Sequence, residues 1–179
     1  MDRRIRKTRK ILKNTLVELM CKKDFRKITV TELTNKADIN RGTFYLHYDD
    51  IYDLVEEMEH EGLEYIKSVI RKHSNPVNYY KILMNIIEYV KMKKKFFQSI
   101  LGKNGDISYV NKLKTEMQKI FIQTNKDIPQ KDSYFQNAFA SFIVSGGMGV
   151  FQEWLDQDCK PPIHNLIRQF YETFIKISL

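Results

Sequence analysis

The segment TVTELTNKADINRGTFYLHY, residues 29–48, most constrains the fold of this chain because it contains two helix starts in quick succession. Thr29 followed by Glu32 is a capping box, which predicts a helix whose N-cap is Thr29. Asp38 tolerates the positive φ of a tight turn, and Asn40 is a favourable N-cap for a second, short helix. A helix, a turn and a short helix in this order predict a helix-turn-helix unit.

Helical periodicity continues through the rest of the chain, and strand signals are weak throughout. We therefore expect an all-α fold of about nine helices. Residues 1–48 are expected to form a helix-turn-helix domain, and residues 49–179 a second, helical domain. A helix over about residues 50–73 connects the two. Further helices are predicted at about residues 3–22, 76–92, 94–102, 107–125, 132–157 and 161–177.

Hydropathy and cysteine content limit the classes of protein to which this chain can belong. No apolar run reaches the roughly eighteen residues of a membrane span, and the N-terminus lacks an apolar stretch of signal-peptide type. Cys21 and Cys159 lie far apart without CxxC spacing. These features predict a reduced protein of the cytosol.

The positive charge is concentrated in the first quarter of the chain. The sequence has 30 Lys and Arg against 22 Asp and Glu, a net charge of +8. Residues 1–48 hold 13 of these basic and 5 of these acidic residues, whereas residues 49–179 hold 17 of each. This asymmetry indicates a polyanionic partner at one end of the molecule. A merely solvated basic face, or a basic helix over residues 3–22 on a membrane surface, are the alternatives.

The short helix after Asn40 combines an inward set of side chains with an outward set of hydrogen-bond donors. Ile39, Phe44 and Tyr48 are spaced to point inward. The outward donors are Arg41, Thr43, Tyr45 and His47. Hydroxyl and imidazole groups suit phosphate oxygens, and an arginine can donate two hydrogen bonds to guanine O6 and N7. Gly42 removes a side chain where DNA could approach closely, or it only permits close helix packing.

This segment resembles the DNA-binding region of TetR-family transcriptional regulators. TVTELTNKADINRGTFYLHYDDIYDL follows the family's order of a Thr-capped helix, an Ala-x-hydrophobic-Ser turn and x-Gly-Thr-x-Tyr-x-His-aromatic. The resemblance covers roughly residues 5–60 and implies sequence-specific binding of a double-stranded DNA operator. The expected DNA-binding residues are Thr29, Thr31, Asn40, Arg41, Gly42, Thr43, Tyr45, His47 and Tyr48.

Three positions depart from the family's pattern. Asp38 replaces the usual turn glycine and Asn40 the usual serine, and both residue types can cap a helix. Ile51 stands where the family commonly has a lysine that contacts phosphate, so we expect that contact to be absent. Basic residues of the N-terminal arm are expected to compensate: Arg3, Arg4 and Arg6.

The C-terminal part implies a homodimer. FIVSGGMGVFQEWLDQDCKPPIHNLIRQF resembles a TetR C-terminal subgroup, some of whose members are similar to regulators of dihydroxyacetone kinase operons. In the family, the last two helices form a four-helix interface with a second subunit. Glycines cost a soluble helix about 1 kcal/mol each, which favours close helix contact here. The expected interface residues are Ile143, Gly146, Gly147, Val150, Trp154, Leu166, Phe170 and Phe174; an ordinary monomeric core is the alternative.

The resemblance also implies a small apolar or amphipathic effector among the middle helices. The candidate lining residues are Met58, Gly62, Tyr65, Ile66, Phe96, Phe97, Ile100, Leu101, Met117, Phe121, Phe139 and Phe142. Such apolar and aromatic residues typically line pockets, although any one of them can simply belong to the core. A repressor is the expected type of regulator, and an activator of the same fold is the alternative.

Sequence motifs give no support to an enzyme. Glu57-x-x-His60 matches half of a carboxylate di-iron motif, but no second Glu-x-x-His occurs in the chain. The sequence has no glycine-rich phosphate loop, no G-x-S-x-G and no Cys/His zinc cluster. We therefore expect no catalytic residue, no metal and no cofactor.

Overall fold

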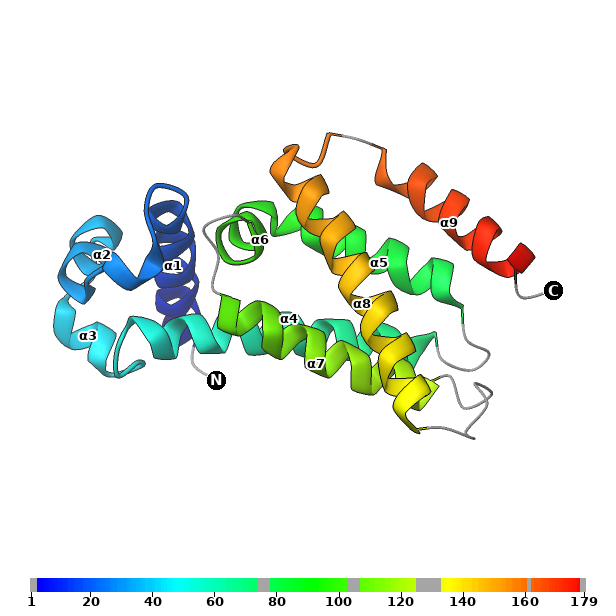
Figure 1. Ribbon diagram of the computed structural model, residues 1–179. Helices are drawn as coiled ribbons and strands as arrows, with labels where there is room; N and C mark the ends of the chain where they lie inside the picture. The colour runs from blue at the N-terminus through cyan, green and yellow to red at the C-terminus, as the bar shows by residue number, and fades with distance from the viewer. Residues whose placement is uncertain (1–2, 74–77, 103–106, 125–132, 161, 178–179) are drawn as a thin grey trace. The chain divides into compact units, whose positions relative to one another are not determined.

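A computed structural model confirms the predicted all-α fold (Figure 1). It describes residues 3–73, 78–102, 107–124, 133–160 and 162–177. These ranges contain nine α-helices, a short 3-10 helix and no strand. None of the helices described combines the length and the apolar character that a bilayer span requires. The helix ends differ from the predicted ones by three residues or fewer.

The chain forms two compact units, residues 1–64 and 65–179, called unit 1 and unit 2 below. The division falls within the fourth helix rather than at residue 48, so this helix contributes residues to both units. The helices that begin in unit 1 are α1 (Arg3–Met20), the 3-10 helix η1 (Phe25–Lys27), α2 (Val30–Ala37), α3 (Arg41–Tyr45) and α4 (Ile51–Lys72).

Unit 1 folds around a small apolar core. Leu12 and Leu16 of α1 lie one helical turn apart and are fully buried, as are Leu33 of α2, Phe44 of α3 and Leu54 of α4. Four helices therefore contribute to one core. The sequence did not predict η1, which forms where the apolar Phe25 turns into this core and the Asp24 carboxylate accepts a hydrogen bond from the Arg26 amide at 3.0 Å.

Unit 2 contains the remaining helices (Figure 1). They are α5 (Tyr79–Met92), α6 (Lys94–Leu101), α7 (Ile107–Thr124), α8 (Ser133–Asp156) and α9 (Ile163–Ile177). α8 packs on α6 and α7, and α5 packs on α6 and α9. The core includes Ile87, Phe97, Ile100 and Leu155, each at most 2% exposed.

Two glutamines join α6 to α8. Gln98 Nε2 donates a hydrogen bond of 2.9 Å to the Leu155 carbonyl, and Gln152 Nε2 donates one of 2.8 Å to the Leu101 carbonyl. Both carbonyls lie in the last turn of a helix, where no amide of the same helix is available. These two hydrogen bonds hold one side of α8 against its own subunit.

Candidate nucleic-acid interface

The predicted caps of the helix-turn-helix unit are confirmed. Thr29 Oγ1 accepts a hydrogen bond of 3.2 Å from the Glu32 amide, and Asn40 Oδ1 accepts one of 2.7 Å from the Gly42 amide. Asp38 adopts the left-handed conformation, with φ 53° and ψ 46°. The turn between α2 and α3 is therefore fixed by local side-chain and backbone geometry that the sequence itself specifies.

Aromatic packing anchors α3 to the rest of unit 1. Phe44 is fully buried, and its ring centroid lies 5.6 Å from that of Tyr48. The guanidinium carbon of Arg9 lies 5.4 Å from the centroid of the Tyr48 ring. Tyr48 is only 3% exposed, so its assignment as a DNA-binding residue is wrong. It holds α3 in place, and burial raises the pKa of its hydroxyl above the usual value.

The opposite side of α3 presents polar side chains. Arg41 Nη2 donates a hydrogen bond of 3.0 Å to the Tyr45 hydroxyl, and the guanidinium carbon lies 5.4 Å from the centroid of that ring. Both side chains are exposed, and Thr43 and His47 are partly exposed. Because Arg41 and Tyr45 are four residues apart, one side chain supports the other in an outward position. The other predicted DNA-binding residues on this surface are also exposed: Thr29, Thr31, Asn40 and Gly42.

The start of α1 carries an unbalanced positive charge. Arg3, Arg6, Lys7 and Lys10 are exposed and form no ion pair within the part of the chain that the structure describes. The first turn of α1 contains no acidic residue. Cations at a helix N-terminus are unfavourable because this end of the helix dipole is already positive. A nearby polyanion would relieve this repulsion.

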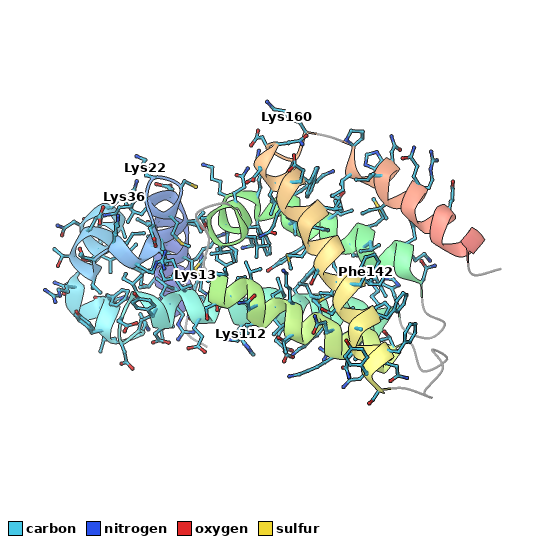
Figure 2. The ribbon with its side chains drawn as sticks, in the orientation of Figure 1. Lys13, Lys22, Lys36, Lys112, Phe142 and Lys160 are labelled. Carbon is cyan, nitrogen blue, oxygen red and sulfur yellow. The ribbon has the colours of Figure 1, made fainter. Side chains whose placement is uncertain are left out.

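Other cations of α1 are occupied within the fold. The Nζ of Lys13, which is labelled in Figure 2, lies 2.9 Å from Glu57 Oε1 and 2.6 Å from Glu61 Oε1. Arg9 also contacts Glu57, at 3.2 Å. Burial alone raises the pKa of Glu57, but the Tyr48 hydroxyl and the cations of Lys13 and Arg9 outweigh it and hold the pKa below 4.5. Glu57 therefore stays charged and ties α1 to α4.

In unit 2, α8 has an apolar face that the described part of its own subunit leaves open. Phe135, Ala138, Phe142, Gly146 and Gly149 follow one another at three- or four-residue steps, and all are exposed. We call these five residues the outer face of α8, and Figure 2 shows Phe142 on this helix. Apart from the helix itself, no heavy atom of the described residues lies within 4 Å of the position that a Cβ would take at either glycine.

Comparison with known proteins places the chain in a family. A family model named TetR_C_8, described as "Transcriptional regulator C-terminal region", matches residues 77–176. The chain belongs to the TetR family of transcriptional regulators. A stretch of the chain is similar to the HTH-type transcriptional regulator YxbF of Bacillus subtilis (strain 168), with 36% identity over 59 residues. That match spans 32% of this chain and only 16% of the Bacillus protein.

Solved TetR-type structures share the fold. A TetR transcriptional regulator from Streptococcus agalactiae 2603V has a TM-score of 0.69 at 20% identity, over 96% of each chain. The dihydroxyacetone kinase operon activator DhaS has a TM-score of 0.65 at 16% identity, over 94% of each chain. The fatty acid degradation regulator FadR from Bacillus halodurans has a TM-score of 0.67 at 15% identity, over 92% of this chain and 93% of that one. Two of these three proteins are described as regulators and DhaS as an operon activator.

The predicted dimer residues of this TetR-family chain fall into three groups. Gly146 and Gly147 are exposed, Leu166 is 39% exposed, and Ile143 and Val150 are half-buried. Trp154 is 3% exposed in the single subunit, so its assignment to the interface is wrong. Its ring lies against Phe151, with 5.8 Å between centroids, and belongs to the subunit's own core. The side chains of Phe170 and Phe174 lie outside the residues that the structure describes.

Most predicted effector-pocket residues of this TetR-family chain are packed against its interior. Phe96, Phe97, Ile100 and Leu101 are buried in unit 2, and Ile66 is buried as well. Met58 and Gly62 are buried residues of α4. The half-buried members are Tyr65, Met117, Phe121 and Phe139. Phe142 is 66% exposed, so its assignment to a pocket lining within the subunit is wrong.

Ring contacts in unit 2 link several of these residues. Tyr65 stacks on Tyr89 with 3.9 Å between centroids, Tyr89 meets Phe97 at 5.7 Å, and Phe121 meets Phe139 at 6.1 Å. A separate open groove of about 420 Å³ shares only Leu101 with the predicted lining. It is bordered by Leu101, Gly102, Ile107, Val110, Asn111, Lys114, Gln152 and Asp156.

One exposed residue of the interface was missed by the sequence reasoning. Leu46 caps the end of α3 and is 80% exposed, more than Tyr45 at 46%. It was overlooked because only hydrogen-bonding side chains were considered as DNA contacts. Its four-residue spacing from Gly42 was the available signal, since it places both residues on one side of the helix.

Proposed function

We propose that unit 1 of this TetR-family regulator binds duplex DNA with sequence preference, with α3 in the major groove. The observation that carries the proposal is the paired arrangement of Arg41 and Tyr45 on a short helix that is capped by Asn40 and anchored by Phe44. A helix of this size fits the major groove, where each base pair presents a distinct pattern of donors and acceptors.

Each outward side chain has a proposed role. Arg41 contacts a base edge, since its guanidinium is supported by Tyr45 and forms no ion pair among the described residues. Tyr45, Thr43 and His47 donate hydrogen bonds to phosphates, which fix the position of the protein on the duplex. Thr29, Thr31, Asn40 and the Gly42 backbone lie at the exposed starts of α2 and α3 and serve the same purpose. The free cations of α1 add attraction that is independent of sequence.

Substitutions separate base contacts from phosphate contacts. A preferred operator is first selected from a random duplex pool, and affinities for it and for a random duplex are measured by fluorescence anisotropy. Tyr45→Ala and His47→Ala should weaken both affinities about equally, whereas Arg41→Ala should also reduce the preference, by about 1–3 kcal/mol. Lys160→Ala, at an exposed position of unit 2, is the matched control. Equal effects of all four substitutions would contradict the assigned roles.

We also propose that the regulator acts as a homodimer through α8 and α9. Support comes from the outer face of α8, because contiguous exposed apolar residues mark interaction sites. A second copy offers the same face, as a twofold interface requires. Such a dimer presents two α3 helices to half-sites about one DNA turn apart, so the selected operator should be near-palindromic. An asymmetric selected sequence would contradict this part of the proposal.

We infer further that a small apolar or amphipathic effector controls DNA binding and that the protein acts as a repressor. The aromatic contacts of unit 2 support an apolar binding region. Activation is the alternative, because the structurally similar DhaS is described as an activator. A metabolite screen by melting temperature, followed by a reporter gene behind the selected operator, tests both points. A screen without any shift would contradict the effector, and higher expression with the protein than without it would contradict repression.

A further inference from the structure

The helical turn over residues 41–48 has a buried face and an outward face directly opposite. Phe44 is fully buried, and Tyr48, four positions later, is 3% exposed. Backbone hydrogen bonds from Leu46 to Gly42 and from Tyr48 to Phe44 show that the helical geometry continues beyond the end of α3. Successive residues are about 100° apart, so Gly42 and Leu46 lie about 160° from the buried face. They form the centre of the outward surface.

The polar side chains flank this centre instead of occupying it. Arg41 and Tyr45 precede Gly42 and Leu46 by one position each, which places them on one side of the centre. Gly42 has no side chain, and a Cβ at this position would lie 3.1 Å from the Asn40 Oδ1 atom that caps the helix. No side chain therefore projects from the outward surface at Gly42. Leu46 therefore projects alone from the middle of the surface.

Exposed leucines are common on proteins and usually need no explanation. Leu46 differs in its position and degree of exposure. It is 80% exposed, and it lies between the Arg41–Tyr45 pair and the partly exposed His47. A surface that contacts the polar side chains on both sides of Leu46 therefore also contacts Leu46. In the major groove, the apolar group that matches a leucine is the C5 methyl of thymine.

We propose that Leu46 contacts a thymine methyl group and so determines specificity at one base pair of each half-site. This inference rests on the proposed binding of DNA by α3. A cytosine at the same position presents an N4 amino donor instead of a methyl and a carbonyl acceptor. Leu46 forms hydrogen bonds with neither base, so replacing thymine by cytosine removes the methyl contact and supplies no new one. Thymine is therefore selected by the methyl contact.

The test removes the methyl group from the DNA and the side chain from the protein. Each thymine of the selected operator is replaced singly by uracil, which lacks only the methyl, and affinities are measured for wild type and for Leu46→Ala. Wild type should lose affinity about fourfold at one thymine of each half-site, as expected for one buried methyl. Leu46→Ala should bind the thymine operator more weakly and lose this sensitivity.

Two controls make the result interpretable. Leu46→Ala should unfold at the wild-type temperature because its side chain is exposed, and Met92→Ala, at an 81% exposed position of unit 2, should keep the uracil sensitivity. The role of Leu46 is overturned if uracil at every position leaves wild-type binding unchanged, or if Leu46→Ala retains the sensitivity to uracil. Either result leaves the proposed DNA binding by α3 intact. A wild type that fails to prefer the selected operator over a random duplex overturns the proposed function itself.

Discussion

Substituting Gly146 distinguishes a solvent-exposed helix face from one that a second subunit covers. Among the residues that the structure describes in the single subunit, no heavy atom outside the local helix lies within 4 Å of the Cβ position, so alanine meets no obstacle from them. Alanine is more favourable than glycine inside a helix by about 0.8–1.0 kcal/mol. For a solvated face, Gly146→Ala should therefore raise the melting temperature by about 2–4 °C.

If a second subunit covers the outer face of α8, a larger side chain at position 146 should weaken the dimer. Overpacking costs about 1–3 kcal/mol per site, and twofold symmetry places Gly146→Leu in the interface twice. The total of about 2–6 kcal/mol should weaken the dimer at least about 30-fold, since 1.4 kcal/mol corresponds to a factor of ten. Sedimentation equilibrium measures the dissociation constant, and Gln123→Leu, at an exposed position of α7, is the matched control.

Two results would refute this reasoning. A wild type that sediments as a monomer at micromolar concentration removes the dimer. A Gly146→Leu protein that dimerises as tightly as both wild type and Gln123→Leu shows that the dimer forms through another surface. In either case Gly146→Ala should still raise the melting temperature, and Gly146→Leu should not weaken a dimer, because the outer face of α8 would then contact only solvent.

Two further predictions concern unit 1. Glu57→Gln should lower stability by about 1–3 kcal/mol at neutral pH, because charged hydrogen bonds to α1 are lost. The pKa of Glu57 in the folded protein lies below 4.5, so the wild type should be more stable than Glu57→Gln above pH 4.5, and this difference should disappear as the pH falls below the folded pKa. Urea unfolding measures both free energies, and a difference that stays the same at acidic pH would contradict this. Asp38→Ala should lose about 1 kcal/mol because alanine tolerates the left-handed conformation poorly, whereas Asp38→Gly should lose nothing; equal losses would count against this.

Local chemistry explains why the helix-turn-helix unit could be predicted from the sequence. Thr29 and Asn40 cap helices through hydrogen bonds to amides two or three residues away, and Asp38 adopts its turn conformation within the same segment. None of these interactions depends on a distant part of the chain. The long helices were predictable for a similar reason, since their apolar periodicity is a property of each segment alone.

Residue orientation was harder to predict where packing between elements decides it. Tyr48 is not such a case, because its four-residue spacing from Phe44 already predicts an inward position, which its 3% exposure confirms. Apolar residues occupy most of the circumference of α8, so periodicity could not show that Trp154 points into the subunit while Phe142 points out of it. Leu46 was missed because only hydrogen-bonding side chains were considered as DNA contacts.

The most direct test of sequence-specific DNA binding is a competition experiment with the wild-type protein. A labelled operator, selected from a random pool, is displaced by unlabelled operator or by unlabelled random duplex at several salt concentrations. The account predicts that the operator competes at least about a thousandfold better than random duplex, and that both affinities fall steeply as salt rises. Equal competition by the two duplexes at every salt concentration would contradict it.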